Sequence, residues 1–265
     1  MNIFLHELKA YRKSTIIWAC AMAAIAIVYL SIFPAFSKDV SDFKKILEGY
    51  PLGVRKALGI SIDSITSLIG FYSFIVGYII LCGAIQAMNI GTSIVSKEVR
   101  EKTADFLLTK PVSRAEILTA KLLSALASLL ITNVIYIIVA IITIAATNSG
   151  KYSMKIFLLI SFTLFFVQVM FMCLGIIISV SMHKIKSVLP ISLGIVFFFF
   201  IISMFGSVIG ENSVRYITPF KYYDPSYIIK NSGYEVQFVL IEIVFIIVTI
   251  IASYIIYSKK DIHTV

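Results

Sequence analysis

Charged residues are scarce in this chain. Only 14% of its 265 residues are Asp, Glu, Lys or Arg, whereas 59% are hydrophobic. A water-soluble domain of this composition would expose far more apolar surface than folded soluble proteins do. The composition therefore excludes a large soluble domain and predicts an integral membrane protein.

Residues and motifs that would support catalysis are also sparse. His6, His183 and His263 lie in predicted ends and loops, too far apart along the chain to form an obvious metal site. The sequence has no HExxH or GxSxG motif and no Gly-rich loop followed by Lys-Ser or Lys-Thr. We therefore expect no enzyme activity, and neither a metal nor a cofactor bound by this chain. Any ATP hydrolysis would belong to a partner subunit.

Cysteine is too rare, and too irregularly spaced, to build a framework. Cys20, Cys82 and Cys173 each lie inside an apolar run, without the paired spacing of disulfide or metal motifs. We expect them to act as small buried hydrophobic residues.

Long apolar runs are abundant, and they recur over the whole length. Six of them suffice to cross the ~30 Å hydrocarbon core of a bilayer as helices. We therefore predict an all-α integral membrane protein in which residues 1–265 form a single transmembrane domain. The first run lacks a small-residue cleavage site after it and is expected to be a retained helix. The predicted spans are 15–36, 66–95, 118–147, 156–181, 188–210 and 236–257.

The segment before the first span has the pattern of a helix lying flat at the membrane surface. Ile3, Phe4, Leu8 and Tyr11 recur at helical spacing. The charged residues Glu7, Lys9 and Arg12 fall outside that apolar stripe. We therefore predict an N-terminal interfacial helix.

The excess of basic residues indicates which loops face the cytoplasm. The formal net charge is +9, and the placement of Lys and Arg in loops and ends favours contact with membrane lipid over nucleic acid. With the N-terminus inside, the inner segments are denser in Lys and Arg than the outer ones. The positive-inside rule thus predicts that both termini are cytoplasmic.

Small residues recur every seven positions along the second span, at Gly70, Gly77, Ala84 and Gly91. Because helices in lipid associate through close backbone approach, this row predicts a tight helix contact. Two interpretations remain open: fixed packing within one subunit, or a contact that slides during a working cycle.

Uncharged polar residues occur within the spans, notably Gln86 and Asn89 in the second and Gln168 in the fourth. The third span contributes the hydroxyl residues Ser124, Ser128 and Thr132. Such groups commonly hydrogen-bond to neighbouring helices. The alternative is that Gln86, Asn89 and Gln168 line a translocation path.

Glu242 is the only carboxylate inside a predicted span. An acid within the membrane is by default a candidate functional group. Because Glu242 lies near the outer end of the last span, it can also reach the interface or pair with Lys221 or Lys230. Both interpretations are kept.

The charged stretch 96–121 between the second and third spans is the most informative part of the chain. Glu98 and Lys102 form an i, i+4 pair, which favours a short helix extending from the second span. The apolar trio at 106–108 and a corner at Pro111 follow. Ser113 and Glu116 then fit a capping box, which predicts that the third span begins there.

The same stretch carries a family resemblance. The run Glu101–Lys121, which reads EKTADFLLTKPVSRAEILTAK, resembles the signature of the first cytoplasmic loop in exporter-type (type two) ABC transporter permeases of bacteria. Lys102 stands where many members have Gly. The segment 216–225, YITPFKYYDP, is similar to the family's Pro-Phe-aromatic segment before the last helix.

The resemblance implies a membrane-spanning permease subunit of an ATP-driven exporter in the bacterial cell membrane. Two permease copies, identical or different, would pair, and each would dock a cytoplasmic ABC ATPase that binds ATP and Mg. A cytoplasmic coupling helix would contact that ATPase. The residues implied in coupling are Glu98, Glu101, Thr103, Phe106, Leu107, Leu108, Pro111 and Arg114.

The resemblance does not indicate the cargo. An alternative function is an ion-coupled secondary transporter that uses Glu242. The absence of inverted repeats and broken helices at mid-membrane argues against it.

Overall fold

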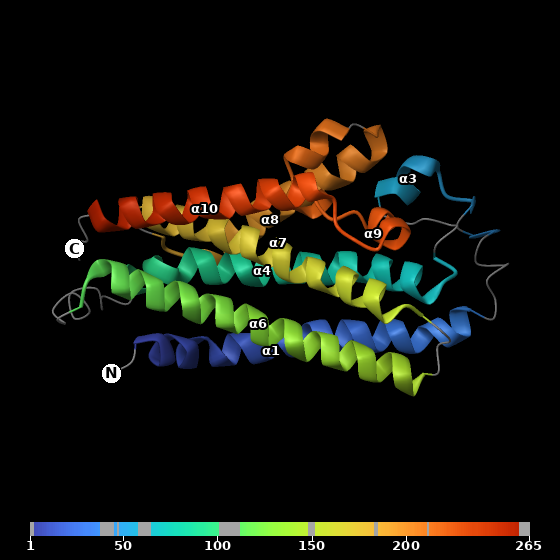
Figure 1. The fold of residues 1–265 in the computed structure, drawn as a ribbon, viewed down its shortest axis with the longest axis horizontal. Coiled ribbons are helices and arrows are strands. Elements are labelled where there is room, and N and C mark those ends of the chain that lie inside the picture. The colour runs from blue at the N-terminus through green and yellow to red at the C-terminus, as the bar shows by residue number, and fades with distance from the viewer. Residues whose placement is uncertain are drawn as a thin grey trace.

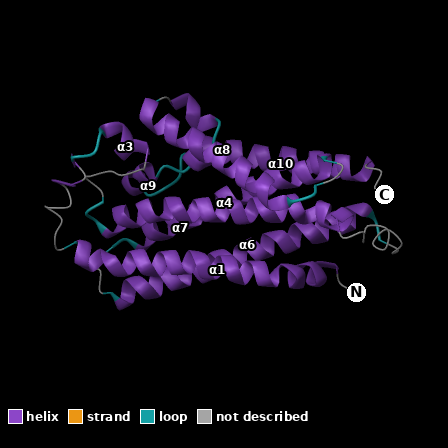
Figure 2. Cartoon of the chain, turned by 180° about the vertical axis from the view of Figure 1, so that it is seen from behind, coloured by secondary structure: helices purple, strands orange, loops and turns teal. Residues whose placement is uncertain are grey.

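The computed structural model describes residues 3–37, 45–46, 48–57, 65–100, 112–147, 152–182, 185–210 and 212–259. All regular elements within these ranges are helices (Figure 2). Six of them are long and apolar enough to cross a membrane, as judged by length and composition. The all-helical prediction with six candidate spans is therefore confirmed. These helices are α1 (Ile3–Phe36), α4 (Leu68–Arg100), α6 (Arg114–Ala146), α7 (Met154–Ser181), α8 (Val188–Ile209) and α10 (Val236–Lys259).

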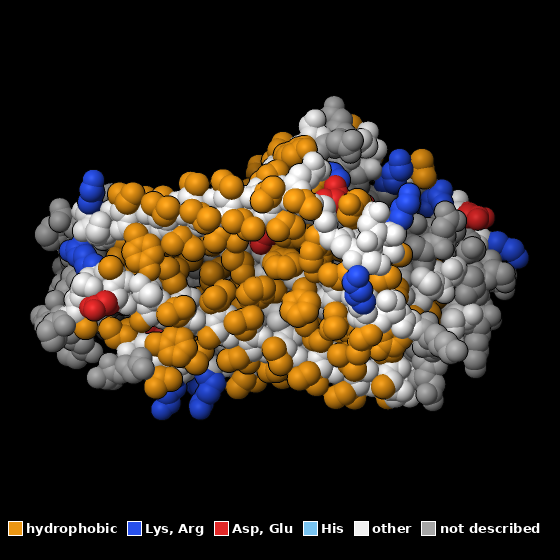
Figure 3. Space-filling view, viewed as in Figure 1, with side chains coloured by type: hydrophobic (Ala, Val, Ile, Leu, Met, Phe, Trp, Pro, Cys, Tyr) orange, Lys and Arg blue, Asp and Glu red, His pale blue; other side chains and the backbone are white. Residues whose placement is uncertain are grey.

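The long helices lie side by side along one direction, and the two chain ends are at the same end of the bundle (Figure 1). We call this end the base, because α4 also ends there and α6 begins there. Hydrophobic side chains cover most of the visible face between the two ends, while Lys and Arg lie mainly toward the ends (Figure 3). This distribution is that of a protein with a lipid-facing belt.

The helix α1 differs from the sequence-based expectation. It runs without interruption for 34 residues from Ile3, so the structure has no separate N-terminal interfacial helix. The physical reason is that neither Gly nor Pro occurs before Pro34, near its C-terminal end. Glu7, Tyr11 and Thr15 follow one another at i, i+4 spacing and are all buried. The face of α1 that includes Glu7 and Thr15 packs on α6, where the Thr15 and Ser128 hydroxyls lie 2.5 Å apart.

The helices α4 and α7 form the most extensive pair in the bundle. A Cβ atom added at Gly91 of α4 would lie 2.3 Å from the Met172 carbonyl oxygen, and one at Gly175 of α7 would lie 2.7 Å from the Thr92 nitrogen. Two glycines therefore face each other where the backbones meet. Nearby, Ser179 Oγ accepts hydrogen bonds from the backbone amides of two α4 residues, at 3.2 Å and 3.1 Å.

Short helices cover the end of the bundle opposite the base, which we call the far end. They are α3 (Leu52–Ala57), η1 (Asn212–Tyr216), η2 (Pro219–Lys221) and α9 (Pro225–Asn231). Arg215 forms an ion pair with Glu235 at 2.5 Å and stacks over Phe238, with 4.3 Å from its guanidinium carbon to the ring centre. These contacts fix the segment before α10 as a folded cap.

Candidate functional site

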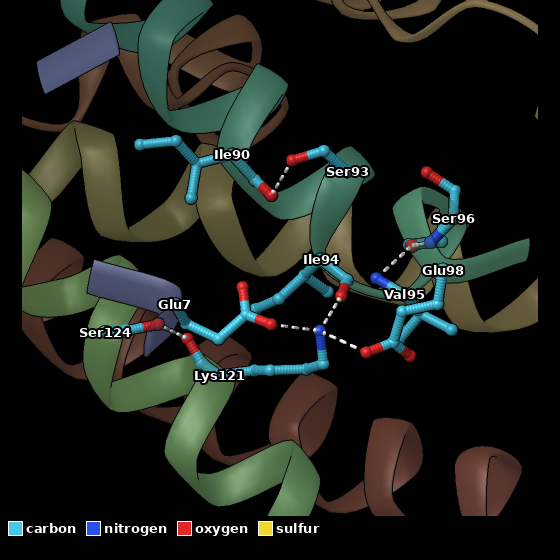
Figure 4. A network of polar contacts seen from close by, with 10 residues as sticks. Glu7, Ile90, Ser93, Ile94, Val95, Ser96, Glu98, Lys121 and Ser124 are labelled. Carbon is cyan, nitrogen blue, oxygen red and sulfur yellow. Dashed lines mark hydrogen bonds and ion pairs between the residues drawn. The ribbon is translucent and has the colours of Figure 1, made fainter. Parts of the chain in front are cut away.

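A buried charged cluster lies at the base, where α1, α4 and α6 meet (Figure 4). Lys121 of α6 is fully buried, and its Nζ lies 3.1 Å from Glu7 Oε1 and 2.7 Å from Glu98 Oε1. The same ammonium donates to the Ile94 carbonyl oxygen at 2.9 Å. All three donors of the lysine are thereby satisfied. We call Glu7, Glu98 and Lys121 the Lys121 cluster.

The start of α6 is fixed by local chemistry, which sets the register of Lys121. Ser113 Oγ accepts from the Glu116 amide at 3.2 Å, and the Ser113 amide donates to Glu116 Oε2 at 2.8 Å. The predicted capping box is therefore confirmed. Lys121 lies two turns further on, on the face of α6 that packs toward α1 and α4.

Electrostatics make the cluster sensitive to the loss of any member. The side chains of Lys121, Glu7 and Glu98 are 1%, 9% and 10% exposed. A charge removed from water to this extent is tolerated only when it is paired and hydrogen-bonded. Because one cation serves two carboxylates from different helices, the cluster joins α1, α4 and α6 at a single point.

Two further contacts attach the start of α6 to the end of α10. Arg114 Nη1 donates to the carbonyl oxygens of Tyr257 and Ser258, both at 3.3 Å. The hydroxyls of Thr119 and Tyr254 lie 2.6 Å apart. Arg114 thus satisfies carbonyl groups in the last turn of α10, where a cation is favourable. The first two turns of α6 consequently contact α1, α4 and α10.

The residues implied in coupling divide into two groups. Glu98 and Arg114 are described and flank the segment 101–111 on its two sides. Glu98 pairs with Lys121, whereas the partner predicted from spacing, Lys102, lies outside the described residues. The others, Glu101, Thr103, Phe106, Leu107, Leu108 and Pro111, also lie outside the described residues.

Two of the three residues proposed for a translocation path, Gln86 and Gln168, belong to a hydrogen-bonded chain between helices. Gln86 Nε2 donates to Thr132 Oγ1 at 2.9 Å, and Gln168 Nε2 donates to Gln86 Oε1 at 3.1 Å. Asn133 Nδ2 donates to Gln168 Oε1 at 2.6 Å. All four residues are buried, whereas Asn89 is half-buried. In this structure Gln86 and Gln168 connect α4, α6 and α7, and the path remains a prediction.

Four buried side chains that join helices were missed by the sequence analysis: Asn133, Tyr136, Tyr72 and Ser161. Asn133 directly follows Thr132. Its amide side chain lies within a predicted span and could have been recognised from the sequence as a polar group there. Tyr136 has its hydroxyl 2.5 Å from that of Tyr72, which in turn lies 2.6 Å from Ser161 Oγ. Tyrosine in a membrane protein ordinarily indicates the interface, so the sequence alone does not identify this buried contact.

The small residues of the α4 row lie in two different environments. Gly91 meets the α7 backbone, and Ala84 is fully buried. Gly77 has nothing within 4 Å of an added Cβ, and it lines a cavity together with Gly70. Close backbone contact with α7 thus occurs at Gly91, whereas Gly77 is exposed and has open space around it.

Glu242 of α10 is 3% exposed and accepts a hydrogen bond from the Tyr223 hydroxyl. Among the described residues its partner is thus Tyr223 rather than the predicted Lys221 or Lys230. Burial, followed by this hydrogen bond, raises the pKa of Tyr223 far above its ordinary value. Tyr223 is the donor in this hydrogen bond.

Together, these features define a multi-pass helical membrane protein in which polar contacts at the base join α1, α4, α6 and α10. A family model described as "ABC-2 family transporter protein" matches residues 1–262. The chain belongs to this family and is an ABC-2 transporter permease. No curated protein matches the sequence.

Proposed function

We propose that this chain is the membrane-spanning permease subunit of an ATP-driven exporter in a bacterial cell membrane, with both termini in the cytoplasm. A separate ABC ATPase subunit binds ATP and Mg, and the segment from Glu98 to Arg114 transmits its closure to the spans. Two permease chains pair, each with one ATPase. Family membership supports the ATPase partner, since permeases of this family work with such subunits.

The contacts among the helices at the base support the coupling proposal. Glu98 near the end of α4 is ion-paired to Lys121 near the start of α6, so both sides of the segment are joined directly. Glu7 and Arg114 extend this attachment to α1 and α10. A displacement of the segment therefore moves the ends of four helices together, because packed interiors pass on displacement instead of absorbing it.

The small-residue row supports the same mechanism. At Gly91, α4 is in backbone contact with α7, so these helices move as a pair near the base. Toward the far end, Gly70 and Gly77 border a cavity that leaves α4 room to rearrange. Motion applied at the base thus changes the packing at the opposite end.

Replacing Phe106 with Ala is expected to weaken binding of the ATPase to the chain by about thirtyfold, the factor that corresponds to about 2 kcal/mol, and so to reduce the amount that co-purifies. A buried aromatic anchor in a helix-in-groove contact contributes at least 2 kcal/mol of binding. The measurement is affinity purification of the tagged chain from its own cells in mild detergent, followed by quantification of the bound P-loop ATPase and of ATP hydrolysis.

The matched control is Ile217→Ala. Ile217 is 58% exposed and lies at the far end, so its removal should leave the complex intact. Equal recovery of the ATPase with both variants would refute the coupling role of Phe106. Absence of any ATPase from the wild-type complex would refute the proposed function itself.

An ion-coupled secondary transporter is the second candidate, and the buried contact between Glu242 and Tyr223 is the observation in its favour. It is the weaker candidate, because a Tyr–Glu hydrogen bond also occurs as a purely structural contact. Transport that continues after ATP depletion and stops in Glu242→Gln would reverse this order.

A further inference from the structure

A partly open cavity of about 340 Å³ lies at the far end of the bundle, among α4, α8 and the short helices of the cap. Its volume is within the range of small-molecule binding sites. The lining has two parts: an apolar part from α4 and α8, which includes Phe74, Phe200 and Met204, and a polar rim at Lys221, Asp224 and Ser226. Such a division suits a ligand that is itself apolar at one end and polar at the other.

Lys221 is the distinctive group in this lining. It is half-buried, and among the described residues its ammonium has neither a hydrogen bond nor an ion pair. Burial lowers the pKa of Lys221 from its ordinary value; Asp224 opposes this shift and Arg215 adds to it. Arg215 is committed to Glu235, and Asp224 caps α9 by accepting from the Ser226 amide at 3.0 Å. A partly desolvated cation without a direct hydrogen bond or ion pair favours an anion beside it.

The apolar part of the cavity has space for a hydrocarbon chain. Gly77 lies in mid-helix on α4, and an added Cβ there would meet nothing within 4 Å. The hydroxyls of Ser203 and Ser207, which also line the cavity, donate to carbonyl oxygens of their own helix at 2.7 Å and 2.9 Å. With those donors satisfied, the wall between α4 and α8 presents mainly apolar surface.

We propose that this cavity binds an amphipathic anion, with its phosphate or carboxylate head at Lys221 and its hydrocarbon chain against Gly77 between α4 and α8. A membrane phospholipid and an exported amphiphile share this chemistry. The assignment is independent of coupling to an ATPase, since it concerns the opposite end of the molecule.

The test is a titration of the full chain in phosphatidylcholine nanodiscs, read by native mass spectrometry. Lysophosphatidylglycerol is expected to bind at one saturable site about tenfold more tightly than lysophosphatidylcholine with the same tail, which is the effect of one charge-assisted contact. Glycerol phosphate, the head alone, should not compete at the same concentration. Binding of two-chain phosphatidylglycerol would identify a membrane lipid as the fitting source, and its failure to bind would identify a single-chain amphiphile.

Two variants with matched controls locate the site. Lys221→Gln should abolish the tenfold preference, whereas Lys230→Gln, an exposed lysine on the neighbouring α9, should retain it. Gly77→Leu should weaken binding of both lipids, whereas Gly194→Leu, which also has open space around it but lies outside the cavity, should not. Unchanged thermal unfolding of each variant shows that the fold is intact.

The inference is overturned if the two lysolipids bind equally to the wild-type chain, or if Lys221→Gln keeps the preference. It is also overturned if glycerol phosphate competes as well as the lysolipid. Because no ATPase is present, these outcomes do not depend on whether the coupling proposal holds.

Discussion

Replacement of Lys121 with Met is expected to lower the free energy of unfolding by about 3–5 kcal/mol, the usual cost of removing one partner from a buried ion pair. Methionine approximates the length of the lysine stem but leaves Glu7 and Glu98 buried without a cation. The Ile94 carbonyl oxygen loses its side-chain donor as well. Thermal unfolding of the purified chain in mild detergent measures the effect.

Two further variants separate the lost ion pairs from a general loss of packing. Adding Glu7→Gln and Glu98→Gln to Lys121→Met should recover much of the stability, because the uncompensated buried charges are then removed. Lys9→Met on the exposed face of α1 is the matched control and should change stability by no more than about 0.5 kcal/mol. If the Lys9→Met and Lys121→Met variants unfolded at the same temperature, the role assigned to the Lys121 cluster would be contradicted.

Gly91→Ala is expected to destabilise the bundle, because overpacking of a close contact costs about 1–3 kcal/mol. The new Cβ would lie 2.3 Å from the Met172 carbonyl oxygen, and since that neighbour is backbone, the two helices must separate. The increase in helix propensity from Gly to Ala, about 1 kcal/mol, acts in the opposite direction, so the net loss of stability should reach about 2 kcal/mol when the full overpacking cost applies. The measurement is again thermal unfolding, together with the yield of monodisperse protein.

The same substitution at Gly194 provides the comparison. Gly194 is exposed in the middle of α8, and nothing lies within 4 Å of an added Cβ. Gly194→Ala should therefore be neutral or slightly stabilising. If Gly91→Ala proved as stable as Gly194→Ala, the close approach of α4 and α7 would be wrong.

Features that depend on local chemistry were predictable from the sequence. Long apolar runs predicted the six candidate spans because their length is set by the bilayer. The Ser113–Glu116 capping box was predictable because its partners are three residues apart.

Features that depend on which helices pack together were not predictable. Glu7 was placed outside the apolar stripe of a surface helix, yet the pairing of α1 with α6 buries it against Lys121. Glu98 was assigned a neighbour four residues away, and the structure gives it a partner from another helix. The period of seven predicted a tight helix contact but not its partner, and the structure places Gly175 of α7 against Gly91. In each case the deciding partner is far away in sequence.

The most direct test of the coupling account is the position of the loop between α4 and α6. A chain in which Cys20, Cys82 and Cys173 are replaced by Ala and Thr103 by Cys should react with a membrane-impermeant thiol reagent only from the cytoplasmic side, and an ATPase bound to the complex should protect it. Labelling of this cysteine from outside intact cells would contradict the account.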